Sequence, residues 1–376
     1  MIRYELPRTE DLIRLGRPRP NGLSIYLPTA PTPAGRDLAF ATAKSAVDEA
    51  VRKLRDTGRS PAIQEALRGQ WTAVAADDRI WSNLAASLVI FLAPDFAEEY
   101  VLPNDLEPRV HVGDYFDLNQ LVRTVTLPQR AFAVTLSSNG WNLWEATATT
   151  RATELELVGE HAEDVAEATH RSTIRGRQLF RRLGGDEGHK VLLERYAQVV
   201  AEAVRTELVR LDPKAAVPLF VFATEPLLSL LRAQQLPWVE VPVPGAPDEL
   251  RPDQIDAAIR ARIGTFTNAA LSAEADRIGN HFASGLAVTD IAQLARAAVS
   301  GAVGKLFYAM SADAKGFLDD SDGAISYDPE NGYDLLSRIA VHVLSNGGEV
   351  VAVRPEEVKA QIWNGKVLAE LRHPMA

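Results

Sequence analysis

Residues 191–223 read VLLERYAQVVAEAVRTELVRLDPKAAVPLFVFA. The first part repeats apolar side chains at helical spacing for about five turns, at Leu193, Tyr196, Val200, Ala203, Val204, Leu208 and Leu211. Val217–Ala223 is a short apolar run typical of a buried strand. A helix over 225–233 and a strand over 238–241 are predicted next. Alternating helices and strands favour parallel strands joined by right-handed crossovers, so the fold class is α/β.

The residues before this stretch predict more of the same sheet. Ala131–Leu136 and Trp141–Ala146 are apolar, strand-forming runs. The turn between them contains Asn139-Gly140, the strongest short-range signal for a hairpin. A third strand is predicted at Glu154–Val158, and Pro242, Pro244, Gly245 and Pro247 predict a loop at the far end.

Patterning on both sides indicates two further α/β segments. In the first, Ala85–Ala93 is a continuous apolar run typical of a central strand. The other elements expected there are strands at 23–27, 100–102 and 109–112, a loop at Pro31, Pro33 and Gly35, and helices at 40–54, 63–74 and 116–125. The elements expected in the last segment are helices at 268–282, 290–299 and 334–344, strands at 305–310, 349–353 and 367–371, and an acidic loop at 319–330. Thr289 is a plausible N-cap, and Asn346-Gly347-Gly348 ends the last helix. The predicted domains are 1–127, 128–263 and 264–376.

Composition excludes several classes of protein. The 376 residues are 46% hydrophobic and 24% charged, which is ordinary for a folded protein of two or three domains. The net charge of −10 excludes a general positive field, so contact with nucleic acid must be local. There is no cysteine, which excludes disulfides, thiolate metal sites and cysteine nucleophiles. No leader or membrane span is predicted, so we expect a cytoplasmic protein that does not bind membranes.

Known catalytic and binding motifs fail when tested on the sequence. Gly301–Leu306 lacks the spacing and the final Ser or Thr of a phosphate-binding P-loop. Asp319–Gly323 begins like a calcium loop, but Leu318 and Pro329 occupy its end-ligand positions. Five histidines stand alone: His111, His161, His281, His342 and His373. We therefore expect no metal and no cofactor.

A basic island interrupts this acidic chain at His170–Lys190. Its cations are Arg171, Arg175, Arg177, Arg181, Arg182 and Lys190, against two acids. Arginine presents a planar fork that suits phosphate, and the glycines Gly184, Gly185 and Gly188 allow close approach to another backbone. The island is either an RNA-backbone contact or a solvated basic surface that pairs with nearby acids such as Glu163, Asp164 and Glu167.

Short patterns of apolar residues along nearly the whole chain resemble those of one family. They are Leu23–Thr29 with Ala34-Gly35-Arg36, Leu88–Phe96, Tyr100–Pro103, Val110–Phe116, Asp334–Ala340 and Asn346–Val353. In order and spacing these are similar to the bacterial relatives of the archaeo-eukaryotic peptide release factor and Pelota. The resemblance implies a decoding-like first domain, a ribonuclease-H-like middle domain, and a last domain similar to kink-turn-binding ribosomal proteins.

The resemblance also locates a departure from the family. Release factors carry Gly-Gly-Gln just before the long helix of the middle domain, and that glutamine helps to place the hydrolytic water. Gly184 and Gly185 match the glycines, but Asp186 stands where glutamine is expected. A carboxylate cannot offer the amide donors and is repelled by phosphate. The resemblance therefore predicts the architecture without the familiar peptide-release activity.

Three functions follow as hypotheses. The first is a ribosome-associated factor without catalytic activity, acting in ribosome rescue or in stress protection. Its partners would be ribosomal RNA and tRNA, with a translational GTPase as a further possible partner and no role for DNA. The second is a diverged peptidyl-tRNA hydrolase or ribonuclease in which Asp186, Glu187 and His189 either bind a metal together or act as acid and base. The third is a protein-interaction module with no RNA role.

Overall fold

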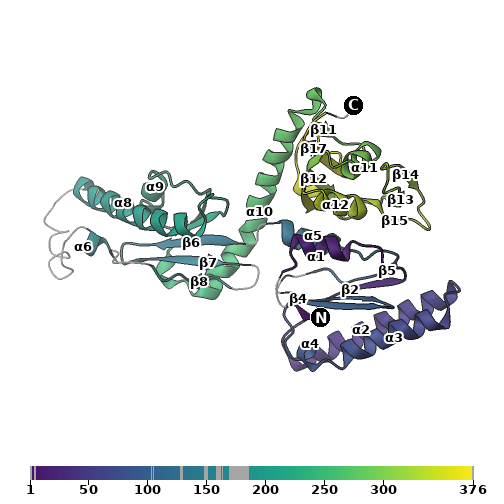
Figure 1. The fold of residues 1–376 in the computed structure, drawn as a ribbon. Coiled ribbons are helices and arrows are strands. Elements are labelled where there is room, and N and C mark those ends of the chain that lie inside the picture. The colour runs from purple at the N-terminus through teal and green to yellow at the C-terminus, as the bar shows by residue number, and fades with distance from the viewer. Residues whose placement is uncertain are drawn as a thin grey trace. The chain divides into compact units, whose positions relative to one another are not determined.

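The fold is a mixed α/β arrangement with several sheets, shown as a ribbon in Figure 1. The structure is a computed structural model that describes residues 2–3, 6–102, 104, 106–127, 130–147, 151–157, 162, 164–168 and 186–374. The chain divides into two compact units. Unit 1 comprises Met1–Leu127 and Asn268–Ala376, and unit 2 comprises Pro128–Thr267. The three predicted domain ranges stay a prediction.

Unit 2 is built on a five-stranded sheet of order β10-β9-β6-β7-β8. Its strands are β6 (Ala131–Leu136), β7 (Trp141–Ala146), β8 (Thr153–Glu154), β9 (Leu219–Ala223) and β10 (Glu240–Pro244). Its helices are α6 (Val165–Ala168), α8 (Asp186–Leu211), α9 (Leu227–Arg232), the 3₁₀ turn η1 (Pro247–Glu249) and the first part of α10 (Pro252–Gly279). The predicted parallel pairing is confirmed, since β9 runs parallel to both β6 and β10. The predicted hairpin is confirmed by the antiparallel pairing of β6 with β7.

Both faces of this sheet are covered. Phe132, Val134 and Leu136 of β6 face α8 and α9, while Ala131 and Ala133 face α10. This alternation explains why the strand sequences are continuously apolar. The predicted helical stripe of α8 is confirmed, because Leu193, Tyr196, Val200, Ala203, Val204 and Leu208 are buried and Leu211 is partly buried.

The first part of unit 1 is a second five-stranded sheet, of order β1-β4-β3-β2-β5. Its strands are β1 (Ile2–Arg3), β2 (Gly22–Pro28), β3 (Ser87–Ala93), β4 (Phe96–Leu102) and β5 (Arg109–Gly113). Its helices are α1 (Thr9–Leu15), α2 (Pro33–Asp56), α3 (Pro61–Ala75), α4 (Asp78–Ser82) and α5 (Asn119–Thr126). Leu88, Ile90 and Leu92 of β3 pack against α2 and α3, which confirms β3 as the buried central strand.

The last part of unit 1 holds a four-stranded sheet of order β11-β17-β12-β16 and a three-stranded sheet of order β14-β13-β15. The strands are β11 (Ala287–Val288), β12 (Val303–Ala309), β13 (Lys315–Leu318), β14 (Ile325–Tyr327), β15 (Tyr333–Asp334), β16 (Glu349–Val353) and β17 (Val367–Leu371). The helices are α11 (Ile291–Val299), α12 (Leu335–Ser345) and the 3₁₀ turns η2 (Phe282–Ser284) and η3 (Pro355–Glu357).

One hydrophobic core joins the two parts of unit 1. Leu12 of α1, Phe91 of β3 and Leu121 of α5 belong to the same buried cluster as Leu306 of β12 and Ile339 of α12. A polar network crosses this core. The Tyr308 hydroxyl donates to Asn119 Oδ1 at 3.0 Å, and Asn119 Nδ2 donates to Asp334 Oδ2 at 2.7 Å. These segments, far apart in sequence, therefore fold as one body.

A second polar bridge connects the same two parts. Arg123 of α5 donates to both carboxylate oxygens of Glu357, at 2.7 and 2.6 Å. Hydrogen bonding by Arg123 and the charge of Arg354 lower the pKa of Glu357, although burial opposes this. The paired, bidentate geometry is the arrangement in which an ion pair is most specific.

The structure corrects several expected elements. Helix α2 begins at Pro33, where a loop was expected, because Thr32 caps the Gly35 amide and proline suits a first turn. Helix α10 begins at Pro252 and continues through Gly264, whereas a helix was expected only from residue 268; an isolated glycine costs a helix only about 1 kcal/mol. The N-cap of α11 is Asp290 rather than Thr289.

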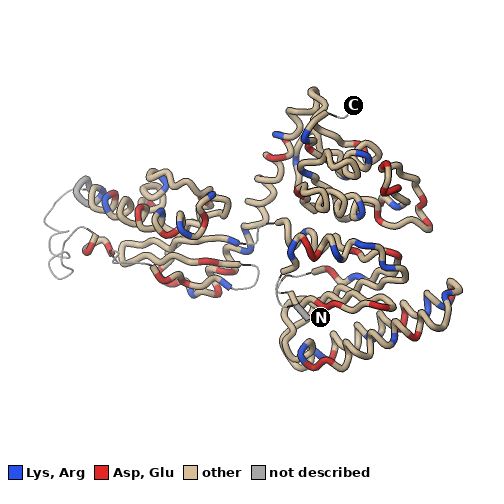
Figure 2. Tube along the Cα trace, in the orientation of Figure 1, with Lys and Arg blue, Asp and Glu red and all other residues tan. Residues whose placement is uncertain are grey.

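Two further corrections concern strands. β10 includes Pro242 and Pro244, which were expected in a loop, because an edge strand tolerates the missing amide donor. The acidic loop at 319–330 contains strand β14. Figure 2 shows acidic residues along the connection between β13 and β14.

Candidate functional site

The predicted RNA-contacting loop lies mostly outside the described residues. This applies to Arg171, Arg175, Arg177, Arg181, Arg182, Gly184 and Gly185. The structure describes the chain again from Asp186, where helix α8 begins. The geometry of the basic loop therefore stays a prediction.

The three weak catalytic candidates are in the first turns of α8. Asp186, Glu187 and His189 have helical backbone there, and only the backbone of these residues is described. Gly188 was expected in a loop but lies in the same helix, where glycine is tolerated near the N-terminus. Lys190 is exposed on α8.

The core beneath this end of α8 is well defined. Trp141 of β7 is buried and its indole Nε1 donates to the Ala162 carbonyl at 2.8 Å. Tyr196 is fully buried, and burial raises the pKa of its hydroxyl. Trp144 of the same strand as Trp141 is also buried, at 8% exposed.

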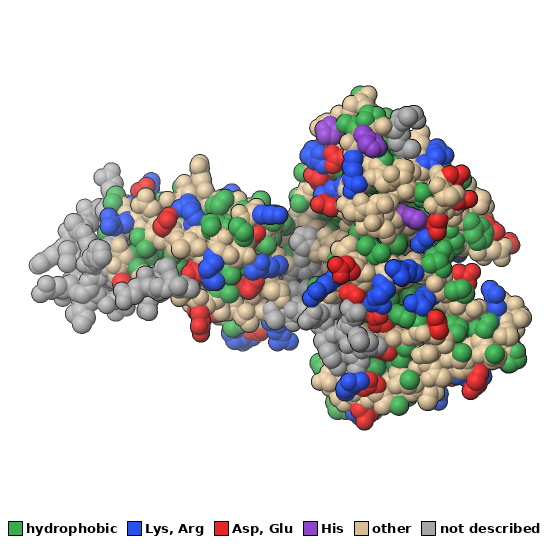
Figure 3. All heavy atoms as spheres, viewed as in Figure 1, with side chains coloured by type: hydrophobic (Ala, Val, Ile, Leu, Met, Phe, Trp, Pro, Cys, Tyr) green, Lys and Arg blue, Asp and Glu red, His purple; other side chains and the backbone are tan. Residues whose placement is uncertain are grey.

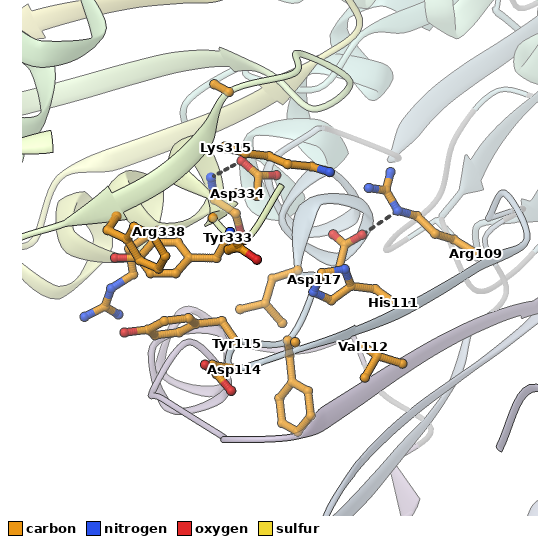
Figure 4. Close-up of a pocket in the computed structure, with 18 of the residues that line it drawn as sticks. Arg109, His111, Val112, Asp114, Tyr115, Asp117, Lys315, Tyr333, Asp334 and Arg338 are labelled. Carbon is orange, nitrogen blue, oxygen red and sulfur yellow. Dashed lines mark hydrogen bonds and ion pairs between the residues drawn. The ribbon is translucent and has the colours of Figure 1, made fainter. Parts of the chain in front are cut away.

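A pocket of about 850 Å³ lies in unit 1. Its walls come from the C-terminal end of α2 and the residues just after it, from β5 and the residues after it, from β13 and β15, and from α12. Figure 4 shows part of this lining. These walls derive from segments about two hundred residues apart in the sequence, which the shared core of unit 1 brings together. Such volumes are in the ~300–1,000 Å³ range of ligand pockets.

One end of the pocket is basic. Arg109 and Lys315 extend toward the same region, with His111 and Asp117 beside them (Figure 4). Arg109 Nε lies 2.6 Å from Asp117 Oδ2. Burial lowers the pKa of His111 below its ordinary value, and the Asp117 carboxylate partly offsets this. This end therefore presents two permanent cations and an imidazole that favours its neutral form.

The other end is aromatic. The ring centroids of Tyr115 and Tyr333 are 4.7 Å apart, and those of Phe317 and Tyr333 are 5.6 Å apart. The Arg338 guanidinium lies 4.9 Å over the Tyr115 ring. It is held by a bond to the Gly16 carbonyl at 3.0 Å and by Asp320 at 2.8 Å. Partial burial raises the pKa of both tyrosines, so their hydroxyls are neutral.

Two acids that line the pocket, Asp334 and the exposed Asp114, have hydrogen-bond partners. Asp334 caps α12 by accepting from the amides of Leu336 and Ser337, and it also accepts from Asn119. Burial raises the pKa of Asp334. Asp114 Oδ1 accepts from the Asn21 amide at 3.4 Å.

Sequence reasoning missed this pocket. It singled out His111, as an isolated histidine, and no other residue at the basic end. The missing information is tertiary, because Arg109 and Lys315 meet only through the shared core. The one local signal was the density of tyrosine and arginine near residues 109–115 and 333–338.

Two of the isolated histidines have local carboxylate partners. His342 Nε2 lies 2.9 Å from Asp320 Oδ1, and His281 Nδ1 lies 3.4 Å from Glu370. Within the described ranges, no group of three or more His, Cys, Asp or Glu side chains is placed to hold a metal ion. In the same part of the chain, no helix is both long and apolar enough to cross a membrane.

A family comparison coincides with one of the two units. Residues 128–267 match the family described as "Bacterial archaeo-eukaryotic release factor family 11". The expected resemblance to this release-factor family is confirmed over these residues. The matched range has the same limits as unit 2, and it ends inside helix α10. Among curated proteins there is no match.

Solved structures of translation factors also resemble the chain. An archaeal translation termination factor, aRF1, is 14% identical, with 97% of this chain and 98% of that chain covered and a TM-score of 0.25. Ribosome-bound archaeal Pelota, in a structure with ABCE1, is 12% identical over 72% of this chain and 73% of that chain, with a TM-score of 0.42. Saccharomyces cerevisiae Dom34 is 10% identical, with 81% of this chain and 77% of that chain covered and a TM-score of 0.36.

Proposed function

We propose that the protein is a ribosome-associated translation factor of the release factor and Pelota type. The observation that supports this is the match of residues 128–267 to a release-factor family, with the limits of a compact unit. In this proposal unit 2 reaches toward the peptidyl-transferase centre, and it acts in rescue of stalled ribosomes or in protection of idle ones. The protein would work in the cytoplasm, and a translational GTPase is a candidate partner.

The proposal assigns domains and contacts as the resemblance suggests. Residues 1–127 would take the decoding-like place and residues 264–376 the place of the last domain. The RNA contacts would be made by the basic loop, through Arg171, Arg175, Arg177, Arg181, Arg182 and Lys190. Lys190 supports this with an exposed position on α8. On the face of unit 1 seen in Figure 3, cations and acids are interspersed. This mixed charge supports an RNA contact that is confined to the basic loop.

Sedimentation tests the proposal. We expect the protein to co-migrate with ribosomes in sucrose gradients and to dissociate as salt rises, since each phosphate contact releases counterions. The double variant Arg181→Gln and Arg182→Gln should bind about tenfold or more weakly, because it removes two charged phosphate partners.

A charge-matched control is available in the same unit. Lys214 and Arg262 are exposed cations of unit 2 that lie outside the loop. The double variant Lys214→Gln and Arg262→Gln should bind ribosomes like the wild type. Equal affinity of the loop variant and the wild type would remove the loop from the interface. Migration only at the top of the gradient, at every salt concentration, would reject ribosome association.

The proposed factor lacks peptide-release activity. Asp186 follows Gly184-Gly185 where release factors carry glutamine. A carboxylate near the peptidyl-tRNA ester would be repelled by phosphate and could not donate a hydrogen bond. We expect background release of labelled peptide from ribosomal complexes with the wild-type protein. Release well above background that is lost in Asp186→Ala would instead support the hydrolase alternative.

A further inference from the structure

We propose that the pocket of unit 1 binds a nucleotide, with the phosphate at Lys315 and Arg109 and the base against the aromatic wall. The shared chemistry is a flat ring joined to a phosphate. A free mononucleotide and a nucleotide within an RNA strand both have this chemistry. The inference rests on residues of unit 1 alone and is independent of the proposed ribosome association.

Lys315 is an available cation at the basic end of the pocket. Lys315 is exposed, and no ion-pair partner of its ammonium is found in the described part of the chain. It extends from β13 toward Arg109 of β5, as Figure 4 shows. The Arg109 side chain is 47% exposed, so its pairing with Asp117 leaves other donors of its guanidinium free to reach solvent. Two cations from different segments thus converge on one place.

His111 provides a third hydrogen-bond donor at the basic end of the pocket. His111 lies beside Asp117 and is largely buried, and its lowered pKa favours the neutral imidazole. A neutral imidazole still carries one N–H donor. Its surroundings are mixed in charge, with Asp117 opposing Arg109 and Lys315. The permanent positive charge for a phosphate therefore comes from Arg109 and Lys315.

The aromatic end of the pocket offers an exposed ring on which a nucleobase can stack. Phe317 is 43% exposed, and Tyr333 and Tyr115 continue the wall away from the basic end. Stacking on aromatic rings and on arginine planes is how proteins hold unpaired bases. Arg338 already lies over Tyr115, so the exposed ring of Phe317 is the available stacking surface.

A further feature of two pocket residues is a polar atom that the described part of the chain leaves unpaired. Arg338 and Asn21 line the pocket, and Arg338 Nε and Asn21 Oδ1 are buried atoms with no hydrogen-bond partner among the described residues. One is a donor and the other an acceptor, and leaving such groups unpaired is costly. Meanwhile Asp117 and Asp334 are engaged by Arg109 and Asn119, which limits their repulsion of a phosphate.

Calorimetric titration of the full chain tests the assignment. The probes are the four ribonucleoside 5′-monophosphates, ribose 5-phosphate, adenosine, and a 5′-phosphorylated pentaribonucleotide. We expect at least one nucleotide or the oligonucleotide to bind, and both ribose 5-phosphate and adenosine to bind at least tenfold more weakly. Binding of mononucleotides identifies a free ligand, whereas binding of the pentamer alone identifies a strand.

Matched variants make the test specific. Lys315→Gln should weaken binding about tenfold, because it removes a charged partner of the phosphate. Phe317→Ser should weaken binding of the nucleotide but not of ribose 5-phosphate. Lys359→Gln, an equal change of charge at an exposed position outside the pocket, should bind as the wild type. The proposal is overturned if no probe binds at millimolar concentration, or if Lys315→Gln and Lys359→Gln bind equally.

The result is separable from the function proposed above. Nucleotide binding that depends on Lys315 can occur in a protein that never sediments with ribosomes. Conversely, salt-sensitive sedimentation that depends on Arg181 and Arg182 can occur without any ligand in the pocket.

Discussion

At the scale of single residues, Glu274 joins helix α10 to strand β12. Both carboxylate oxygens accept from Arg277 at 3.0 Å, and Lys305 Nζ lies 3.2 Å away. Hydrogen bonding by Arg277 lowers the pKa of Glu274 from 4.5 to about 2. A carboxyl with a lowered pKa stabilises the fold above its unfolded pKa, and this contribution is lost as pH falls toward the folded value. The loss should therefore occur between pH 4.5 and about pH 2.

Thermal melts of Glu274→Gln should show this pH dependence. Near pH 7 we expect the variant to be less stable by about 1 kcal/mol, the discounted value for a partly exposed pair. The difference from the wild type should shrink as pH falls below 4.5. Glu10→Gln, at an exposed position, is the charge-matched control. A difference that is constant from pH 7 to pH 3 would contradict the assigned pairing.

At the scale of elements, helix α10 contains a glycine that the fold does not require. Gly264 lies in the helix, and a Cβ there would meet nothing within 4 Å. Gly69 of α3 has the same open surroundings. Because alanine has fewer unfolded conformations than glycine, Gly264→Ala and Gly69→Ala should each raise stability by about 0.5–1 kcal/mol. Denaturant unfolding measures the change.

The contrasting position is Gly323. Its φ is +75°, and a Cβ there would lie 2.5 Å from the Arg296 Cα. Gly323→Ala should destabilise the protein by about 1–3 kcal/mol, from backbone strain and the clash together. If Gly264→Ala were also destabilising, α10 would not be a continuous exposed helix at that point.

At the scale of the whole molecule, the two units differ in whether a single continuous segment of the chain contains the whole hydrophobic core. Both hydrophobic clusters of unit 2 contain only residues of unit 2, among the described residues. In unit 1, by contrast, Leu12 and Leu121 share a cluster with Leu306 and Ile339. Residues 128–267 expressed alone should therefore unfold cooperatively, whereas residues 1–127 alone should expose this apolar surface and bind a hydrophobic dye.

Circular dichroism and dye fluorescence of the two fragments check this expectation. Joining residues 1–127 to residues 268–376 through a flexible linker should restore a cooperative transition and remove the dye signal. Residues 1–127 that unfold cooperatively without their partner segment would show that the shared core is not needed. That result would favour the three separate domains expected from the sequence.

Local patterns were enough to predict most elements. The stripe of α8, the central strand β3 and the hairpin of β6 and β7 follow from spacing and turn residues, because these signals act within a few residues. The errors fell where context overrides a local signal. Pro242 and Pro244 are accepted because β10 is an edge strand, and Gly264 is accepted within a long helix.

The sequence by itself determined the α/β class, the acidic character, the lack of cysteine chemistry and the basic island at His170–Lys190. Only the tertiary structure decided that residues 1–127 and 268–376 share one core, and that Arg109 meets Lys315 across a pocket. The physical reason is distance along the chain. Periodicity reports which face of an element is buried, but it does not report which distant segment covers that face.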